Sequence, residues 1–172
     1  PLSNVNDLLG SEAYPGEEAN RHISSRFLLL HTLSHLVVRQ LEYFAGVPSA
    51  SIRERLYCSS SELVPKMAGV LLYTTSPDQV GSLAGLSILA EPESFLRILQ
   101  AALERGQWCS FDPVCSEHEG SGPGALNRAA CHGCCHLPEP SCEVGNILLD
   151  RTFVISPGRG VTASLGFFKG VF

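Results

Sequence analysis

Apolar side chains recur at helical spacing along residues 23–45, and this pattern is the clearest structural signal in the chain. Ser24 or Ser25 can cap the start of this predicted helix, and Gly46 followed by Pro48 ends it. The apolar positions cover most of the helix circumference: Ile23, Phe27, Leu30, Leu33, Leu36, Val37, Leu41 and Phe44. Because little of the surface is polar, we predict that this helix lies at the centre of the core.

Two short segments follow the central helix. Residues 50–58 predict a short helix, with Arg53, Glu54 and Arg55 on its solvent side. Residues 69–75, Gly-Val-Leu-Leu-Tyr-Thr-Thr, are apolar and β-prone. This run is too short for a buried helix, and it predicts a buried strand.

Two further helices are predicted before a change in composition. Residues 83–89 read as a short helix and residues 92–105 as an amphipathic one, which begins at Pro92 and ends at Gly106. The order of elements predicts an α+β fold with helices packed on a small sheet. We expect residues 1–22 to form a connector or arm, residues 23–155 a single domain, and residues 156–172 a tail.

The composition indicates one globular domain. The chain has 172 residues, of which 44% are hydrophobic and 17% charged, and a formal net charge of −5. No apolar run reaches the roughly 18–20 residues that a membrane span needs, so we predict no contact with a membrane. An acidic chain is also not a nucleic-acid binder by bulk electrostatics. Because it begins at Pro1, we expect a processed chain or an excised fragment.

The positions of the two lysines exclude a motor. A phosphate-binding loop needs Gly-Lys-Ser/Thr, but Lys66 follows Pro65 and Lys169 follows Phe168. The His-x-Lys pairs of phospholipase-D-type nucleases are absent as well. Any ATP hydrolysis linked to this protein must therefore reside outside these residues.

Cysteine is concentrated in one segment. Six of the seven cysteines lie between Cys109 and Cys142, within a stretch of Cys, Gly and Pro that spans residues 108–145. Such a segment has too few apolar residues to fold unaided, and a metal ion is the natural staple. Clustering around Cys-x-x-Cys favours a metal site in a reducing cytoplasm over a secreted, disulfide-bonded domain.

The cysteine spacing defines a candidate zinc site. Cys131-His-Gly-Cys134 is a knuckle that can place two thiolates on one zinc ion, and Cys109 and Cys115 are the nearest upstream pair. Cys142 can replace either upstream ligand, whereas Cys135 is expected to be a semi-buried non-ligand because adjacent side chains diverge. Rival ligands are His118, His132 and His136. A closed four-thiolate site is structural, because it leaves no open position for a substrate.

His31 and His35 lie one helical turn apart and share a face of the central helix. This spacing is that of His-Glu-x-x-His zinc proteases, but Thr32 replaces the glutamate. We therefore favour two buried structural histidines. The alternative is a metal-dependent hydrolase or nuclease that uses His31, His35 and an acid such as Asp78 or Glu117. Arg39 extends this polar stripe, to which the Gly81 loop or the cysteine lobe can dock.

The only candidate surface for DNA or a partner is basic. Five arginines fall within residues 21–55, against Glu42 and Glu54: Arg21, Arg26, Arg39, Arg53 and Arg55. A solvated helix face explains this cluster nearly as well.

Several motifs, in order along residues 25–155, resemble the MrfA-like zinc-binding domain. This domain occurs at the C-terminus of certain superfamily-two DNA helicases and of helicase-partner proteins. The closer resemblance is to the partner proteins of the DISARM antiphage defence system. The motifs are Leu-His-Thr-Leu-Ser-His-Leu (30–36), Ile-Arg-Glu-Arg (52–55), Leu-Leu-Tyr-Thr-Thr (71–75), Trp-Cys-Ser (108–110), Ala-Cys-His-Gly-Cys (130–134) and Ser-Cys-Glu (141–143).

This resemblance implies one structural zinc ion on Cys109, Cys115, Cys131 and Cys134. It also implies a partner, a DrmA-like helicase subunit, that supplies ATP hydrolysis and DNA translocation. The expected function is a non-catalytic module that scaffolds this complex and reaches DNA through it. Fifteen residues separate the second and third cysteines here, whereas the four are compact in the helicase-borne domain.

Overall fold

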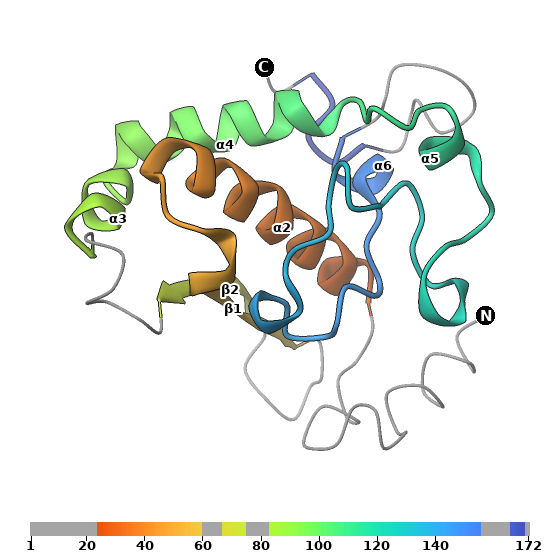
Figure 1. The fold of residues 1–172 in the computed structure, drawn as a ribbon, viewed down its shortest axis with the longest axis horizontal. Helices are drawn as coiled ribbons and strands as arrows, with labels where there is room; N and C mark the ends of the chain where they lie inside the picture. The colour runs from red at the N-terminus through yellow and green to blue at the C-terminus, as the bar shows by residue number, and fades with distance from the viewer. Residues whose placement is uncertain (1–23, 60–66, 75–82, 156–165, 171–172) are drawn as a thin grey trace.

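A computed structural model describes residues 24–59, 67–74, 83–155 and 166–170 (Figure 1). The longer elements are α2 (Ser25–Ala45), β1 (Ile52–Ser59), β2 (Met67–Thr74), α3 (Leu83–Leu89) and α4 (Pro92–Gly106). The C-terminal part contains only short pieces: α5 (Val114–Glu117), α6 (Arg151–Val154), and 3-10 turns at Ser49–Ser51, Pro123–Ala125 and Glu139–Ser141. The predicted α+β class, with helices on a small sheet, is confirmed.

Helix α2 is the central element, as its apolar pattern predicted. The side chain of Ser24 accepts a hydrogen bond from the N–H of Phe27 and caps the start. Gly46 ends the helix in the left-handed region at φ 65°, where a glycine carries no steric penalty. The helix contacts α4, both strands and α6. Figure 1 shows it between α4 and the β-hairpin.

The predicted helix at residues 50–58 is wrong, because these residues form β1, the first strand of an antiparallel hairpin. Glu54 pairs with Leu72, and side chains alternate along the strand, so that Ile52, Glu54 and Leu56 are buried while Arg55 is exposed. Glu54 therefore points into the core rather than to solvent. The sequence misled because Arg-Glu-Arg is compatible with an exposed helix. The alternation of buried and exposed side chains that marks a strand becomes evident only from the pairing with β2.

Strand β2 confirms the predicted strand, but not its burial. Its side chains are exposed or half-buried throughout, and they alternate only from Val70 to Thr74; Leu71 is 48% exposed. Because β2 pairs only with β1 within the described sheet, it is an edge strand.

Helix α4 covers the opposite side of α2 from the hairpin and buries Ile98, Ala102 and Leu103. Its contact with α2 is close, since a Cβ placed on Gly106 would lie 3.1 Å from Leu36. Helix α3 has the predicted bounds, and α4 extends the predicted one by a single residue.

The cysteine-rich segment wraps one side of α2 and returns to the core. The residues that follow this segment contribute Ile147 and Leu149, which are fully buried, before α6 packs against α2. The predicted connector at 1–22 lies outside the described residues, as does most of the tail at 156–172. Within residues 166–170, the N–H of Phe167 donates to the carbonyl of Phe153 at 3.0 Å. Among the described residues, no helix has the length and apolarity that crossing a membrane requires.

Candidate metal centre

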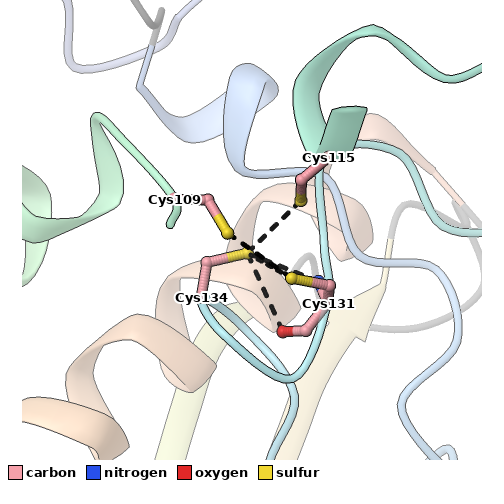
Figure 2. Close-up of side chains that lie close together, drawn as sticks. All are labelled: Cys109, Cys115, Cys131 and Cys134. Carbon is pink, nitrogen blue, oxygen red and sulfur yellow. Dashed lines mark hydrogen bonds between the residues drawn. The ribbon is translucent and has the colours of Figure 1, made fainter. Parts of the chain in front are cut away.

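Four cysteine side chains converge where the cysteine-rich segment crosses α2 (Figure 2). Cys109 follows α4, Cys115 lies in α5, and Cys131 and Cys134 belong to one turn. All four sulfur atoms lie within 4.8 Å of one another. Three of these cysteines are buried, and Cys131 is half-buried.

The sulfur separations fit a tetrahedral zinc ion. Sγ of Cys131 lies 3.5 Å from that of Cys109 and 3.8 Å from that of Cys134, and Cys115 lies 3.8 Å from Cys134. Four sulfurs at about 2.3 Å from a tetrahedral ion are about 3.8 Å apart. The donor set therefore matches a closed, all-sulfur zinc site in both chemistry and size.

The turn that carries Cys131 and Cys134 has the expected knuckle form. The N–H groups of Cys134 and Cys135 both donate to the carbonyl of Cys131, at 3.1 and 2.9 Å. Gly133 is required by a close approach, because a Cβ there would lie 3.0 Å from the ring of Phe111. The loop after Cys109 is thus packed directly on the turn that holds the other pair.

A buried cation accompanies the four thiols. Arg151 is completely buried and donates to the carboxylate of Asp112, which in turn accepts the N–H of Cys109 at 2.7 Å. The pKa of Cys134 is lowered to about 4, first by a hydrogen bond from the Cys135 thiol, and also by the Cys131 N–H and the charge of Arg151. Burial raises the pKa of Cys115 instead. These contacts favour the thiolate form of Cys134, which is the form in which a cysteine binds zinc.

The remaining candidate ligands lie outside this cluster. Cys135 is fully buried, rather than semi-buried, and its carbonyl accepts a hydrogen bond from His35 at 2.9 Å. His136 is stacked edge-on with His132, and its Nε2 lies 3.4 Å from the amide nitrogen of Asn127. Nδ1 of His118 accepts the N–H of Gly120 at 3.1 Å. Each of the three rival histidines therefore has a local structural contact.

Two asparagines that sequence reasoning missed also order the cysteine-rich segment. Asn127 is completely buried, donates to the carbonyl of Asn146 at 2.7 Å and accepts the N–H of Leu149 at 3.0 Å. Asn146 accepts the N–H of Leu137 and donates back to its carbonyl, both at 2.9 Å. These bonds satisfy backbone groups in a region without regular structure.

His31 and His35 are completely buried, and both bond to backbone carbonyls, as the structural interpretation predicted. The acid beside them is Glu54, whereas Glu117 is exposed and Asp78 lies outside the described residues. Cys142 joins this group rather than the cysteine cluster, with its sulfur 3.3 Å from Nε2 of His31. The expectation that Cys142 can replace an upstream cysteine is therefore not met by the geometry.

Arg39 docks the cysteine-rich segment onto α2. Its guanidinium donates to the carbonyls of His136, His132 and Gly133, at 3.0, 3.3 and 3.4 Å. The expectation that the cysteine lobe docks onto the polar stripe of α2 is therefore confirmed. The other expected docking partner, the Gly81 loop, lies outside the described residues.

The described arginines of the predicted basic patch bond to the protein itself. Besides Arg39, Arg26 donates to the carbonyl of Met67 at 3.5 Å, and Arg53 to that of Pro140. Arg55 forms an ion pair with Glu143 at 2.6 Å. The described arginines of the patch are therefore engaged with protein groups, and Arg21 lies outside the described residues.

Comparison with known proteins agrees with this geometry. A model of the MrfA Zn-binding domain family matches residues 33–135, a span that contains all four clustered cysteines. The DISARM protein DrmB of Bacillus paralicheniformis is 43% identical over 145 residues, which cover 84% of this chain. The same alignment covers 25% of DrmB, so the chain spans about a quarter of the length of that relative.

Proposed function

Since the chain belongs to the MrfA Zn-binding domain family, we propose that it is a non-catalytic zinc module that scaffolds a DNA-translocating antiphage defence complex. Zinc binding is a property of the family, and the 43% identity to part of DrmB supports a role in a DISARM-type defence system. The scaffolding role is our inference. The main observation in its support is the closed four-cysteine cluster. A zinc ion held by these four sulfurs would stabilise the fold and have no open coordination position for a substrate.

We assign the zinc ion to Cys109, Cys115, Cys131 and Cys134. Their sulfur separations support this choice, as does the location of all four within the family match. The extent of the domain is proposed as residues 23–155. This boundary is supported by the packing of α6 against α2, although α6 lies beyond the matched span.

A non-catalytic role is supported by what the four thiolates can do. Catalytic zinc keeps one position for water or substrate, whereas four thiolates fill a tetrahedral ion and give the site a negative charge. The alternative, a hydrolase or nuclease based on His31 and His35, needs a metal with an open position. Both histidines are completely inaccessible to solvent, which argues against that function.

We further propose that a helicase subunit, similar to DrmA, is the partner, and that DNA is reached through the complex. Neither lysine of the sequence lies in a phosphate-binding loop, so the motor must be supplied elsewhere. The described arginines of the predicted basic patch are bonded within the domain, so this patch offers few unengaged cations to DNA. The six cysteines from Cys109 to Cys142 form no disulfide bonds with one another, which fits a reducing cytoplasm.

The proposal is tested by co-expressing the whole protein that carries this chain with the helicase subunit of the same defence system. Cys131→Ser and Cys134→Ser should abolish co-purification of the helicase subunit and lower DNA-stimulated ATP hydrolysis by the pair. Cys135→Ser is the matched control, because it changes the neighbouring cysteine outside the cluster. A complex that assembles with full activity after zinc loss would contradict the scaffolding role.

A further inference from the structure

Four metal-binding side chains that the cysteine cluster does not use meet inside the core, between α2, β1 and the segment after residue 141. They are His31, His35, Glu54 and Cys142, and one donor atom of each lies within 4.8 Å of the donors of the others. All four residues are buried. Nitrogen, oxygen and sulfur donors are costly in a core unless each has a partner, so this concentration calls for an explanation.

Backbone carbonyls fix which nitrogen of each histidine faces the others. Nδ1 of His31 lies 3.2 Å from the carbonyl oxygen of Leu148, and Nδ1 of His35 lies 2.9 Å from that of Cys135. Because a carbonyl oxygen only accepts, each Nδ1 carries a proton and donates it. In the neutral ring, Nε2 is then an acceptor whose lone pair points into the cluster. Metal-binding histidines in proteins are oriented by the same kind of outer hydrogen bond.

The carboxylate and the thiol are held in a similar way. Ser34 donates to Oε2 of Glu54, which turns Oε1 toward both histidines. Oε1 also accepts the N–H of Glu143 at 3.2 Å. The sulfur of Cys142 accepts the N–H of Asn146 at 3.1 Å. These outer bonds orient both groups and leave lone pairs on the oxygen and the sulfur to face the cluster.

The separations between the facing atoms fit one tetrahedral zinc ion. Nε2 of His31 lies 3.2 Å from Oε1 of Glu54 and 3.3 Å from Sγ of Cys142, and Nε2 of His35 lies 3.4 Å from the same oxygen. Nitrogen and oxygen ligands at about 2.0 Å from zinc are about 3.3 Å apart, and nitrogen and sulfur ligands are about 3.5 Å apart.

A divalent ion also balances the charges of the cluster. With neutral histidines, one carboxylate and one thiolate match the two charges of zinc, and the site as a whole is neutral. A neutral, fully ligated site is the form that an enclosed core accommodates best.

We propose that His31, His35, Glu54 and Cys142 bind a second structural zinc ion, which joins α2 and β1 to the C-terminal segment. Binding converts the Cys142 thiol to a thiolate and releases its proton to solvent. Four protein ligands leave no position for water, so this site supports the fold rather than a reaction. The family match includes neither His31 nor Cys142, so the second ion is additional to the zinc of the family domain.

The first test counts zinc ions and identifies their ligands in the unaltered chain. The full chain is purified with zinc supplied and then desalted, and its metal content is measured by mass spectrometry and X-ray absorption. We expect about two zinc ions per chain, with five sulfur donors shared between them and nitrogen or oxygen at the remaining positions. One zinc ion with sulfur ligands only would overturn the proposal, as would one zinc ion with mixed ligands.

The second test assigns the sites with variants. Cys142→Ala and His31→Ala should each halve the zinc content and leave one ion with sulfur ligands only. The matched controls, Cys58→Ala and His132→Ala, change residues outside both clusters and should retain both ions. An unchanged zinc content in Cys142→Ala would overturn the assignment.

A third measurement remains informative if these variants fail to fold. Glu54→Gln keeps the shape of the side chain but removes its charge, so one of the two ions should be lost to a chelator at least tenfold faster than in the unaltered chain. Equal rates of loss would contradict the proposal. The zinc content is independent of helicase binding, so failure of the scaffolding role would leave these results unchanged.

Discussion

Arg151, the first residue of α6, is completely buried and forms an ion pair with Asp112, which lies in the loop between Cys109 and Cys115. The same guanidinium donates to the carbonyl of Gly106 at the end of α4 at 3.1 Å. One side chain thus connects the C-terminal helix, the end of α4 and the first half of the cysteine cluster. The buried guanidinium is tolerated because the carboxylate of Asp112 neutralises its charge. Loss of either partner would leave an unpaired charge that destabilises the fold.

Asp112→Ala should lower the free energy of unfolding by about 2 kcal/mol, because it leaves the buried Arg151 without its counter-charge. We place the effect below that of a fully buried pair, since Asp112 is 24% exposed. Urea denaturation measures the change. Glu117→Ala, which alters a nearby exposed acid, should shift stability by less than about 0.5 kcal/mol. Equal effects of the two substitutions would show that the ion pair does not matter.

Cys131→Ser or Cys134→Ser should release the zinc of the first site and unfold the segment from residue 108 to residue 145. Metal binding energy is folding energy in a segment with so little regular structure. Zinc analysis together with a thermal melt detects both effects. Cys135→Ser should change stability by no more than roughly 1 kcal/mol, because a serine hydroxyl can still donate a hydrogen bond to the sulfur of Cys134. Unchanged zinc in both cluster variants would reject the assignment.

Arg39→Ala should loosen the cysteine-rich segment from α2 without removing zinc. The substitution deletes three hydrogen bonds from a charged donor to backbone carbonyls, which together contribute about 2 kcal/mol. Hydrogen exchange should accelerate at residues 131–137. Arg39→Lys should not restore protection, since an ammonium cannot reproduce the planar fork of a guanidinium. Arg97→Ala, on the exposed side of α4, is the control and should leave exchange at these residues as it was.

Removal of both bound metals with a chelator should expose thiols in the cysteine-rich segment to modification. The six cysteines from Cys109 to Cys142 are buried or half-buried in the folded chain, so they should react slowly while zinc is present. Thiol titration before and after chelation measures this change. If the reactive thiol count stays constant while zinc leaves, the segment is ordered without metal.

DNA binding by this chain alone should be weak, with a dissociation constant of ~10⁻⁴ M or higher at physiological salt. The net charge is −5, and the described arginines around α2 bond to protein groups. Fluorescence anisotropy with a duplex should show binding that strengthens steeply as salt is lowered. Sub-micromolar binding at physiological salt would instead make this chain a direct DNA reader.

The sequence allowed the main elements to be predicted where one pattern dominated. Helix α2 was clear because its apolar periodicity, its capping serine and Gly46 all agreed. The four clustered cysteines could be picked out because a Cys-x-x-Cys turn constrains two ligands locally. Cys142 could not be placed by spacing, since its partner His31 is 111 residues away.

The strand at residues 52–59 was missed for a related reason. Arg-Glu-Arg reads as an exposed helix turn, and nothing nearby in sequence reveals that the central glutamate faces two histidines. Only the pairing with β2 fixes which side of the strand is buried. Glu54 is a candidate ligand only because the hairpin packs against α2, and the sequence does not reveal this packing.

Helix α2 contacts the cysteine-rich segment and the residues just after it through main-chain carbonyls: His31 at Leu148, His35 at Cys135, and Arg39 at His132, Gly133 and His136. Every residue has a backbone carbonyl, so these contacts depend on where the main chain runs and not on which side chains it carries. Related chains can therefore exchange residues at positions such as His132 and His136 and keep the interface. An insertion or deletion of a single residue between Cys131 and Leu148 shifts at least one of these acceptors relative to the others, and we expect such length changes to be absent from functional relatives.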